Sequence, residues 1–187
     1  MSLPLISMSV LFLTGSVLLL VAGVGHGRRR ATLAATLSTH RLVPLRLVPA
    51  MSLCVVGTEL AVGVSGAFAA VRWQTGGVLP VTPALAQAAL YLLFLSYLIA
   101  LMWLRPGSDC GCSHRNTPVN ALTVGRAAIL AGAALTFPAL GAAEAASISL
   151  SGLEVVMTWL CSGILVAALS VVPHALPGVP ALQSKVG

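Results

Sequence analysis

Two cysteines separated by a single glycine, Cys110 and Cys112, are the most reactive group of side chains in the sequence. Asp109 precedes them, and His114 and Arg115 follow, shortly before an apolar stretch that is predicted to be a helix. A helix N-terminus and neighbouring cationic side chains both lower the pKa of a thiol. A disulfide across so small a ring would be strained and therefore oxidising. The group could act as a redox pair, a nucleophile or a base.

A metal site is the less favoured interpretation of the same residues. Asp109, Cys110, Cys112 and His114 would supply four ligands. Ligands so close together in one short segment seldom close a tetrahedral site, so we expect no bound metal. The remaining alternative is that both cysteines are ordinary loop residues.

Three further candidate site residues, Cys54, Glu59 and Arg126, belong to predicted membrane spans. Cys54 and Cys161 are more typical of small core residues than of reactive ones, although Cys54 lies near the membrane side that carries the cysteine pair. Glu59 falls near the middle of its span, where a carboxylate is costly and is usually functional or partnered. As a structural residue it would pair with Arg126, or stay protonated and hydrogen-bond a neighbour.

The other ionisable residues in or near these spans are expected to have no role in a site. His26, His40 and His174 are interpreted as lone, inert interfacial residues, and Glu154 can reach the interface. The sequence contains no glycine-rich phosphate loop, no haem attachment motif and no Ser/His/Asp arrangement.

The composition shows which solvent surrounds these residues. Of the 187 residues, 58% are hydrophobic and 7% are charged, and the mean hydropathy is +1.00. A soluble domain carries roughly a quarter charged residues. The chain therefore cannot cover itself with a hydrated surface, and a lipid bilayer is its expected environment. The net charge of +6 does not indicate nucleic acid, because the basic residues are not interleaved with aromatic ones.

Five stretches meet the requirement of about 20 mostly apolar residues for a spanning helix. They lie at roughly 5–25, 47–71, 84–104, 121–143 and 150–172. Helices satisfy their backbone groups internally in lipid, so we predict an all-α bundle with a four-helix core, a fifth helix and a single domain over 1–187. The basic segment 28–44 is predicted to form a short interfacial helix. The first span lacks preceding basic residues and is expected to be retained rather than cleaved.

The basic residues are unevenly divided between the two predicted sides of the membrane. One side carries Arg72 alone, and the other carries nine residues: Arg28, Arg29, Arg30, Arg41, Arg46, Arg105, Arg115, Arg126 and Lys185. The positive-inside rule places these nine in the cytoplasm of a bacterial-type cell with an inner membrane, and the N-terminus outside. The loop with Cys110 and Cys112 is then cytoplasmic.

Several of these features occur together in an order that resembles a known family. They are an apolar helix, a basic segment ending in His40-Arg41-Leu42-Val43-Pro44, a second helix with Glu59, the cysteine pair before the fourth helix, and Arg126 near the start of that helix. Over residues 5–140 the chain resembles the MauE branch of the DoxX-like membrane proteins. That family usually has Phe-Gly after the pair, whereas Ser113-His114-Arg115 follows here.

The resemblance implies a redox role. The family is associated with methylamine utilisation and is thought to help form disulfides in a partner dehydrogenase subunit. Its architecture is also similar to that of vitamin K epoxide reductase, a quinone-coupled thiol oxidant. The resemblance therefore implies Cys110 and Cys112 as the redox pair, with Cys54 as a relay and a quinone as electron acceptor. His114, Arg115 and Arg126 would support the pair.

Two enzymatic hypotheses and one structural hypothesis remain open. The first is thiol–disulfide exchange with a thioredoxin-like or substrate protein, but a cytoplasmic loop lies in a reducing compartment. The second is cofactor-independent epimerisation or elimination on a precursor peptide of the linaridin type. Such chemistry needs a base and a facing acid, which Cys110, Cys112, Asp109 and Cys54 would supply. The third is a packing subunit that pairs with a second membrane subunit.

Overall fold

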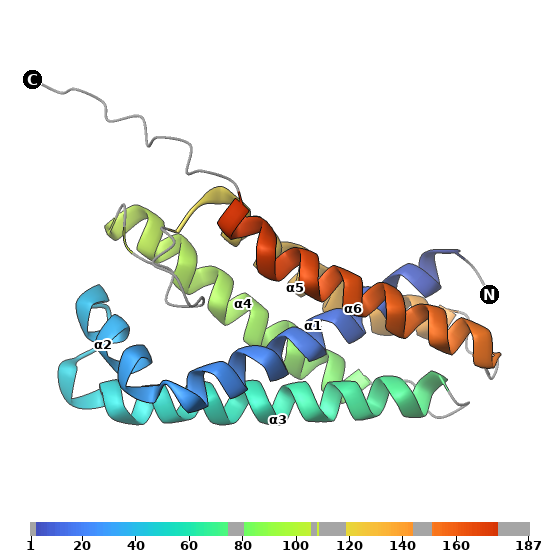
Figure 1. The fold of residues 1–187 in the computed structure, drawn as a ribbon, viewed down its shortest axis with the longest axis horizontal. Coiled ribbons are helices and arrows are strands. Elements are labelled where there is room, and N and C mark those ends of the chain that lie inside the picture. The colour runs from blue at the N-terminus through green and yellow to red at the C-terminus, as the bar shows by residue number, and fades with distance from the viewer. Residues whose placement is uncertain (1–2, 75–80, 106–107, 109–118, 144–150, 176–187) are drawn as a thin grey trace, which may run out of the picture.

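The structure is a computed structural model that describes residues 3–74, 81–105, 108, 119–143 and 151–175 (Figure 1). These residues form six α-helices and one short 3-10 helix, and none of them belongs to a strand. The elements are α1 (Leu3–Arg28), α2 (Arg30–His40), η1 (Leu45–Leu47), α3 (Val48–Gln74), α4 (Val81–Leu104), α5 (Ala121–Ala143) and α6 (Gly152–Ala175).

Five of the helices are long and apolar enough to cross a membrane, namely α1, α3, α4, α5 and α6. Many of their large side chains face outward, among them Phe68, Leu93 and Ile164, which are 64%, 65% and 71% exposed. Side chains of this kind on the outside of a bundle require lipid as solvent. The predicted all-α membrane bundle is confirmed, whereas the single domain over 1–187 stays a prediction.

Helix α1 runs through the middle of the bundle. It packs most extensively against α3 and also contacts α5 and α6, while α4 packs against α5 and α3 (Figure 1). Lipid gives no hydrophobic drive for helices to associate, so close packing must stabilise the contacts. Glycines on α3 allow it: a Cβ added at Gly63 would lie 3.0 Å from the backbone nitrogen of Leu20, and one at Gly66 would lie 2.5 Å from Ser16 Oγ.

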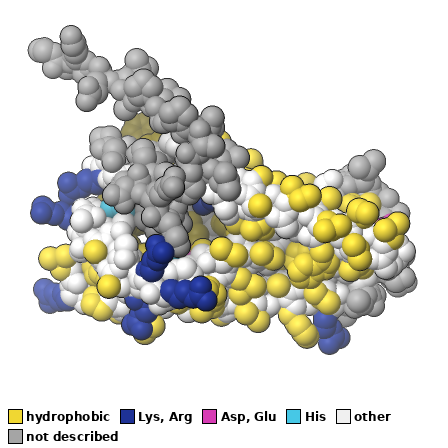
Figure 2. Space-filling view, viewed as in Figure 1, with side chains coloured by type: hydrophobic (Ala, Val, Ile, Leu, Met, Phe, Trp, Pro, Cys, Tyr) yellow, Lys and Arg dark blue, Asp and Glu magenta, His cyan; other side chains and the backbone are white. Residues whose placement is uncertain are grey.

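One end of the bundle gathers basic side chains, and we call it the basic end. Its exposed arginines lie in or beside α2 and at the ends of α1 and α4: Arg28, Arg29, Arg30, Arg41, Arg46 and Arg105. Figure 2 shows Lys and Arg side chains concentrated around α2, with apolar atoms covering much of the rest of the visible face. Arg72 belongs to the last turn of α3, toward the opposite end.

The short helix predicted within 28–44 is present as α2. Its Leu33 and Leu37 are buried in one cluster with Val48 and Val56 of α3. The helix ends at His40, and the next residue, Arg41, adopts a left-handed conformation (φ 53°, ψ 24°) that turns the chain back toward α3. The apolar side of α2 is thus covered by protein.

The opposite end is closed by aromatic side chains. Phe12 of α1 stacks on Phe137 of α5 with ring centroids 4.8 Å apart, and Trp73 of α3 meets Phe137 edge-on at 4.9 Å. Phe12 and Phe137 are completely buried and Trp73 is 5% exposed. The interior of the bundle therefore differs in character along its length.

Candidate functional site

The connection between α4 and α5 carries the predicted cysteine site. The backbone N–H of Val119 donates to the carbonyl of Ser108 at 2.9 Å, so the two flanks of this connection are joined. Asn120 then caps α5 by accepting hydrogen bonds from the Thr123 backbone and hydroxyl at 3.0 and 2.9 Å. Both flanks lie toward the basic end, because α4 ends there.

Five predicted site residues lie outside the described part of the chain: Asp109, Cys110, Cys112, His114 and Arg115. The metal set considered above is drawn from these same residues. Their roles as a redox pair, an acid/base group or ligands therefore stay predictions.

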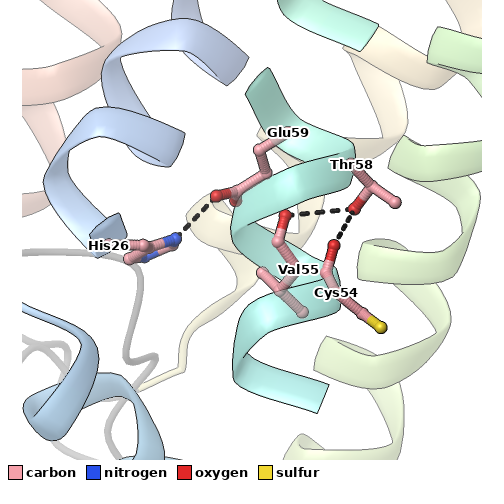
Figure 3. Close-up of polar contacts among 5 residues, drawn as sticks. All are labelled: His26, Cys54, Val55, Thr58 and Glu59. Atoms are coloured by element: carbon pink, nitrogen blue, oxygen red, sulfur yellow. Dashed lines mark hydrogen bonds and ion pairs between the residues drawn. The ribbon is translucent and has the colours of Figure 1, made fainter. Parts of the chain in front are cut away.

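Cys54 lies two turns into α3 from the basic end and is exposed on the outer face of that helix. Figure 3 shows its sulfur directed away from the side of α3 that faces α1. Its carbonyl oxygen accepts a hydrogen bond from the Thr58 hydroxyl at 2.8 Å. The expectation that Cys54 and Cys161 are small core residues is wrong, since both are free and exposed.

Glu59 is buried and paired inside the bundle. Its carboxylate Oε2 lies 2.8 Å from Nδ1 of His26, which belongs to the last turn of α1 (Figure 3). The Glu59 side chain is 3% exposed and the imidazole 15% exposed. The predicted cost of a mid-span carboxylate is thus met by a specific partner. The pairing is made across the tight contact between α1 and α3.

The predicted pairing of Glu59 with Arg126 is wrong. Arg126, in the second turn of α5, donates from one guanidinium nitrogen to the carbonyl of Leu169 at 3.0 Å. Leu169 lies four residues before Pro173 in α6, and because proline has no backbone N–H the Leu169 carbonyl lacks its usual partner within the helix. An arginine satisfies such a group well, so Arg126 joins α5 to α6.

Two of the histidines expected to be lone residues have partners. His26 pairs with Glu59, and Nδ1 of His40 lies 2.7 Å from the hydroxyl of Tyr97 on α4. His40 is 3% exposed. The sequence shows that His26 is an ionisable residue in the last turn of an apolar helix, but it does not show which residue is its partner. The side chain of His174 lies outside the described residues.

A second polar layer lies deeper in the bundle, between α1 and α4. Ser16 donates to the amide oxygen of Gln87 at 2.8 Å, and the Gln87 amide donates to the Phe12 carbonyl at 3.2 Å. Tyr91 donates to the Gly15 carbonyl at 2.8 Å. These groups are satisfied by one another and by the backbone, as groups buried in a membrane must be.

Among the described residues, His26 and Glu59 form a histidine–carboxylate pair inside the bundle, at the end of α1 that lies toward the basic end. A histidine in contact with a carboxylate is a common acid/base arrangement. The polar layer of Ser16, Gln87 and Tyr91 consists of neutral donors and acceptors and is suited to specifying helix packing. Residues able to do redox chemistry occur only in the cysteine-bearing connection and at Cys54 and Cys161.

Residues 3–140 match the family model described as "Methylamine utilisation protein MauE". The matched segment runs from the start of α1 nearly to the end of α5 and includes the cysteine-bearing connection. Helix α6 lies outside it. No curated protein and no solved structure matches the chain.

Proposed function

The chain belongs to the MauE family of membrane proteins, and on that premise we propose that it exchanges disulfides with a partner protein through Cys110 and Cys112. The observation that carries the proposal is the Cys-Gly-Cys spacing within the family-matched segment, in the connection between α4 and α5. Two cysteines separated by one residue can interconvert between a dithiol and a disulfide, and the strain of so small a ring makes that disulfide oxidising.

The proposed exchange proceeds through two displacements. A thiolate of the partner attacks one sulfur of the Cys110–Cys112 disulfide, which forms a mixed disulfide and releases the other cysteine as a thiolate. The second partner sulfur then attacks the mixed disulfide. The partner leaves as a disulfide and the pair remains as a dithiol, so that two electrons have moved to the pair.

The direction of net exchange depends on the side of the membrane. The basic end, with the cysteine-bearing connection, is proposed to face the cytoplasm by the positive-inside rule. In that compartment the pair would reduce a disulfide of its partner and become a disulfide itself, and a cytosolic thiol reductant such as glutathione would return it to the dithiol. On the outer side it would act as an oxidant, and a membrane quinone, as co-substrate, would accept its two electrons and two protons.

The partner is proposed to be a thioredoxin-like or substrate protein that reaches the basic end, with a second membrane subunit presenting it. An exposed arginine cluster surrounds this end. Complementary acidic charge on the partner would speed the encounter. Cys54 is proposed as a relay on the outer face of α3.

The test is to trap the mixed disulfide. We expect Cys110→Ser or Cys112→Ser to accumulate a covalent adduct with the partner, because the remaining cysteine cannot be displaced by its neighbour. The adduct is measured as a reductant-sensitive band on a non-reducing gel and identified by mass spectrometry. The double variant should form none. Cys161→Ser is the matched control, since Cys161 is exposed on α6 far along the chain and should leave the adduct unchanged.

Two other outcomes favour the alternative functions. Loss of activity in both single variants without any adduct would favour acid/base chemistry on a precursor peptide. Full activity of the double Cys110→Ser and Cys112→Ser variant would leave a packing subunit of a membrane complex as the function.

A further inference from the structure

The segment that joins α2 to α3 brings arginines and exposed leucines together at the basic end. It comprises residues 41–47, includes η1, and is called the α2–α3 turn below. We propose that the α2–α3 turn is a binding site for an anionic phospholipid. Leu45 and Leu47 enter the acyl-chain region of the leaflet, while the two arginines of the turn, Arg41 and Arg46, bind the phosphate. This site goes beyond disulfide exchange and does not depend on it.

The leucines of η1 are the apolar side chains that this segment offers to lipid. Leu45 is 71% exposed and Leu47 is 51% exposed. The leucines of α2 do not offer the same contact, because Leu33 and Leu37 are buried in one cluster with residues of α3. Insertion into the leaflet is therefore made by the turn and not by the apolar side of α2.

The depth of the turn in the bilayer follows from the length of the span that it begins. Together η1 and α3 form an apolar segment of 30 residues, Leu45–Gln74. About 20 residues cross the hydrocarbon region, so the remainder must lie at the level of the headgroups. Arg72 is exposed in the last turn of α3 and marks the opposite boundary. The remainder therefore falls at the beginning of the segment, which places η1 at the level of the phosphates.

The end of α4 marks the same level. Trp103 in its last turn is 78% exposed, and the exposed Arg105 follows the helix. Tryptophan and arginine at the end of a span are typical of the boundary between acyl chains and headgroups. The last residue of α2, His40, joins the turn to this helix, since its Nδ1 lies 2.7 Å from the Tyr97 hydroxyl of α4. The two helix ends therefore meet the same leaflet.

The arginines of the turn need an anion from outside the described chain. Both are exposed, and in the part of the chain that the structure describes neither guanidinium forms an ion pair. The two acidic residues of that part are engaged elsewhere: Glu59 is buried against His26, and Glu154 accepts hydrogen bonds from Ser151. An anionic headgroup supplies the missing charge, because arginine binds phosphate through two parallel N–H bonds.

The backbone of Arg41 gives independent support. Its φ of 53° lies in the left-handed region, where among the described residues no other non-glycine residue is found. Helices commonly end in this conformation with glycine, which has no Cβ to strain. Arginine at this position tolerates a strain that glycine would avoid, and such outliers cluster at sites of binding. Contact with a phosphate gives the side chain that role.

The combination of side chains favours lipid over an acidic protein segment. An acidic segment would neutralise the arginines but would leave both leucines of η1 without an apolar partner. A phospholipid accommodates both kinds of side chain, because its phosphate and its acyl chains are adjacent. The other exposed arginines of the basic end remain available to the partner protein of disulfide exchange.

The experiment measures lipid binding to the full-length protein in neutral detergent by native mass spectrometry. Dioleoylphosphatidylglycerol is the anionic probe, and dioleoylphosphatidylcholine is the neutral one. We expect the wild type to prefer the anionic lipid. Arg41→Gly and Arg46→Gln should each lower the affinity for it by about fivefold and leave the affinity for the neutral lipid unchanged.

Arg41→Gly has a second readout that a merely structural role would move in the other direction. Glycine adopts a positive φ without strain, so this variant should unfold in detergent at the same temperature as the wild type or at a higher one. Leu45→Ser and Leu47→Ser test the apolar half of the site. Each should weaken both lipids by about tenfold, because burial of a leucine does not depend on headgroup charge.

Arg105→Gln is the matched control, since it removes the same charge from the basic end but lies outside the turn. It should change the affinity for the anionic lipid by less than about twofold, because exposed charges act over short distances in salt. Equal binding of the two lipids by the wild type overturns the proposal, as does a loss in Arg105→Gln as large as in Arg46→Gln. Unchanged lipid binding in both arginine variants of the turn, with a weaker adduct to the partner protein, assigns these arginines to an acidic protein surface and also overturns it.

Discussion

At the scale of single residues, the closest approach of α1 and α3 depends on glycine. A side chain at Gly63 would meet the backbone of Leu20, which cannot move aside without displacing α1. We expect Gly63→Val to destabilise the bundle by about 1–3 kcal/mol, the usual cost of overpacking. Thermal unfolding in detergent micelles measures the change.

Gly57 is the matched control on the same helix, because a Cβ there would meet nothing within 4 Å. Gly57→Val should leave the unfolding temperature close to that of the wild type. Equal losses at both positions would show that helix propensity, rather than the contact with α1, determines the effect.

The sequence identified Glu59 but not its partner. A carboxylate in an apolar span is conspicuous by residue type alone, and the same reasoning required some compensating group. The partner depends on the register of α1 against α3, which places Gly23 beside Leu60 and Ser16 beside Gly66. Apolar periodicity identifies the two helices but does not predict how far one is offset along the other. Arg126 was therefore an expected partner and His26 was not.

At the scale of elements, α2 is held to the bundle by few contacts. Its buried leucines pack on α3, and the hydrogen bond between His40 and Tyr97 joins its end to α4. Removing the hydroxyl with Tyr97→Phe should cost about 0.5–1.5 kcal/mol and should act locally. We expect faster hydrogen exchange at the amides of α2, with α3 and α5 unchanged.

The control for this prediction is Thr39→Ala on α2. The Thr39 hydroxyl bonds only the Thr36 carbonyl within its own helix, at 2.8 Å. Its loss should alter exchange in α2 much less than Tyr97→Phe does. Faster exchange across the whole protein in Tyr97→Phe would contradict the local role of this bond.

The helices themselves were predictable, since length and hydropathy suffice to recognise membrane spans. The short basic helix was predictable too, because its apolar residues recur at helical spacing. What the pattern could not show is which surface covers them: Leu33 and Leu37 pack on α3. It also could not show that Arg126 would join α5 to α6: Pro173 leaves the Leu169 carbonyl without a partner in its own helix, but the sequence does not say which donor satisfies it.

At the scale of the whole molecule, the two ends of the bundle differ in charge and in the interior they enclose. The basic end has exposed arginines, and His26 and Glu59 form an ionisable pair inside the bundle near it. At the opposite end, the stacked rings of Phe12 and Phe137 fill the interior. Helix α6 follows the family-matched segment and attaches through Ser162, which donates to the Val10 carbonyl at 3.2 Å, and through Arg126. The two ends of the bundle are therefore chemically different, and under the proposed function the orientation decides whether the cysteine pair acts as an oxidant or as a reductant.

Orientation can be measured by placing single cysteines at the two ends in a variant whose four native cysteines are serine. Ala35 is exposed on α2 at the basic end, and Gly152 is exposed at the start of α6 at the other end. The arginine asymmetry predicts that Ala35→Cys reacts with a membrane-impermeant maleimide only after permeabilisation, whereas Gly152→Cys reacts in intact cells. The reverse pattern would contradict the positive-inside orientation and would place Cys110 and Cys112 in an oxidising compartment. The pair would then act as an oxidant, with its electrons passing to a quinone.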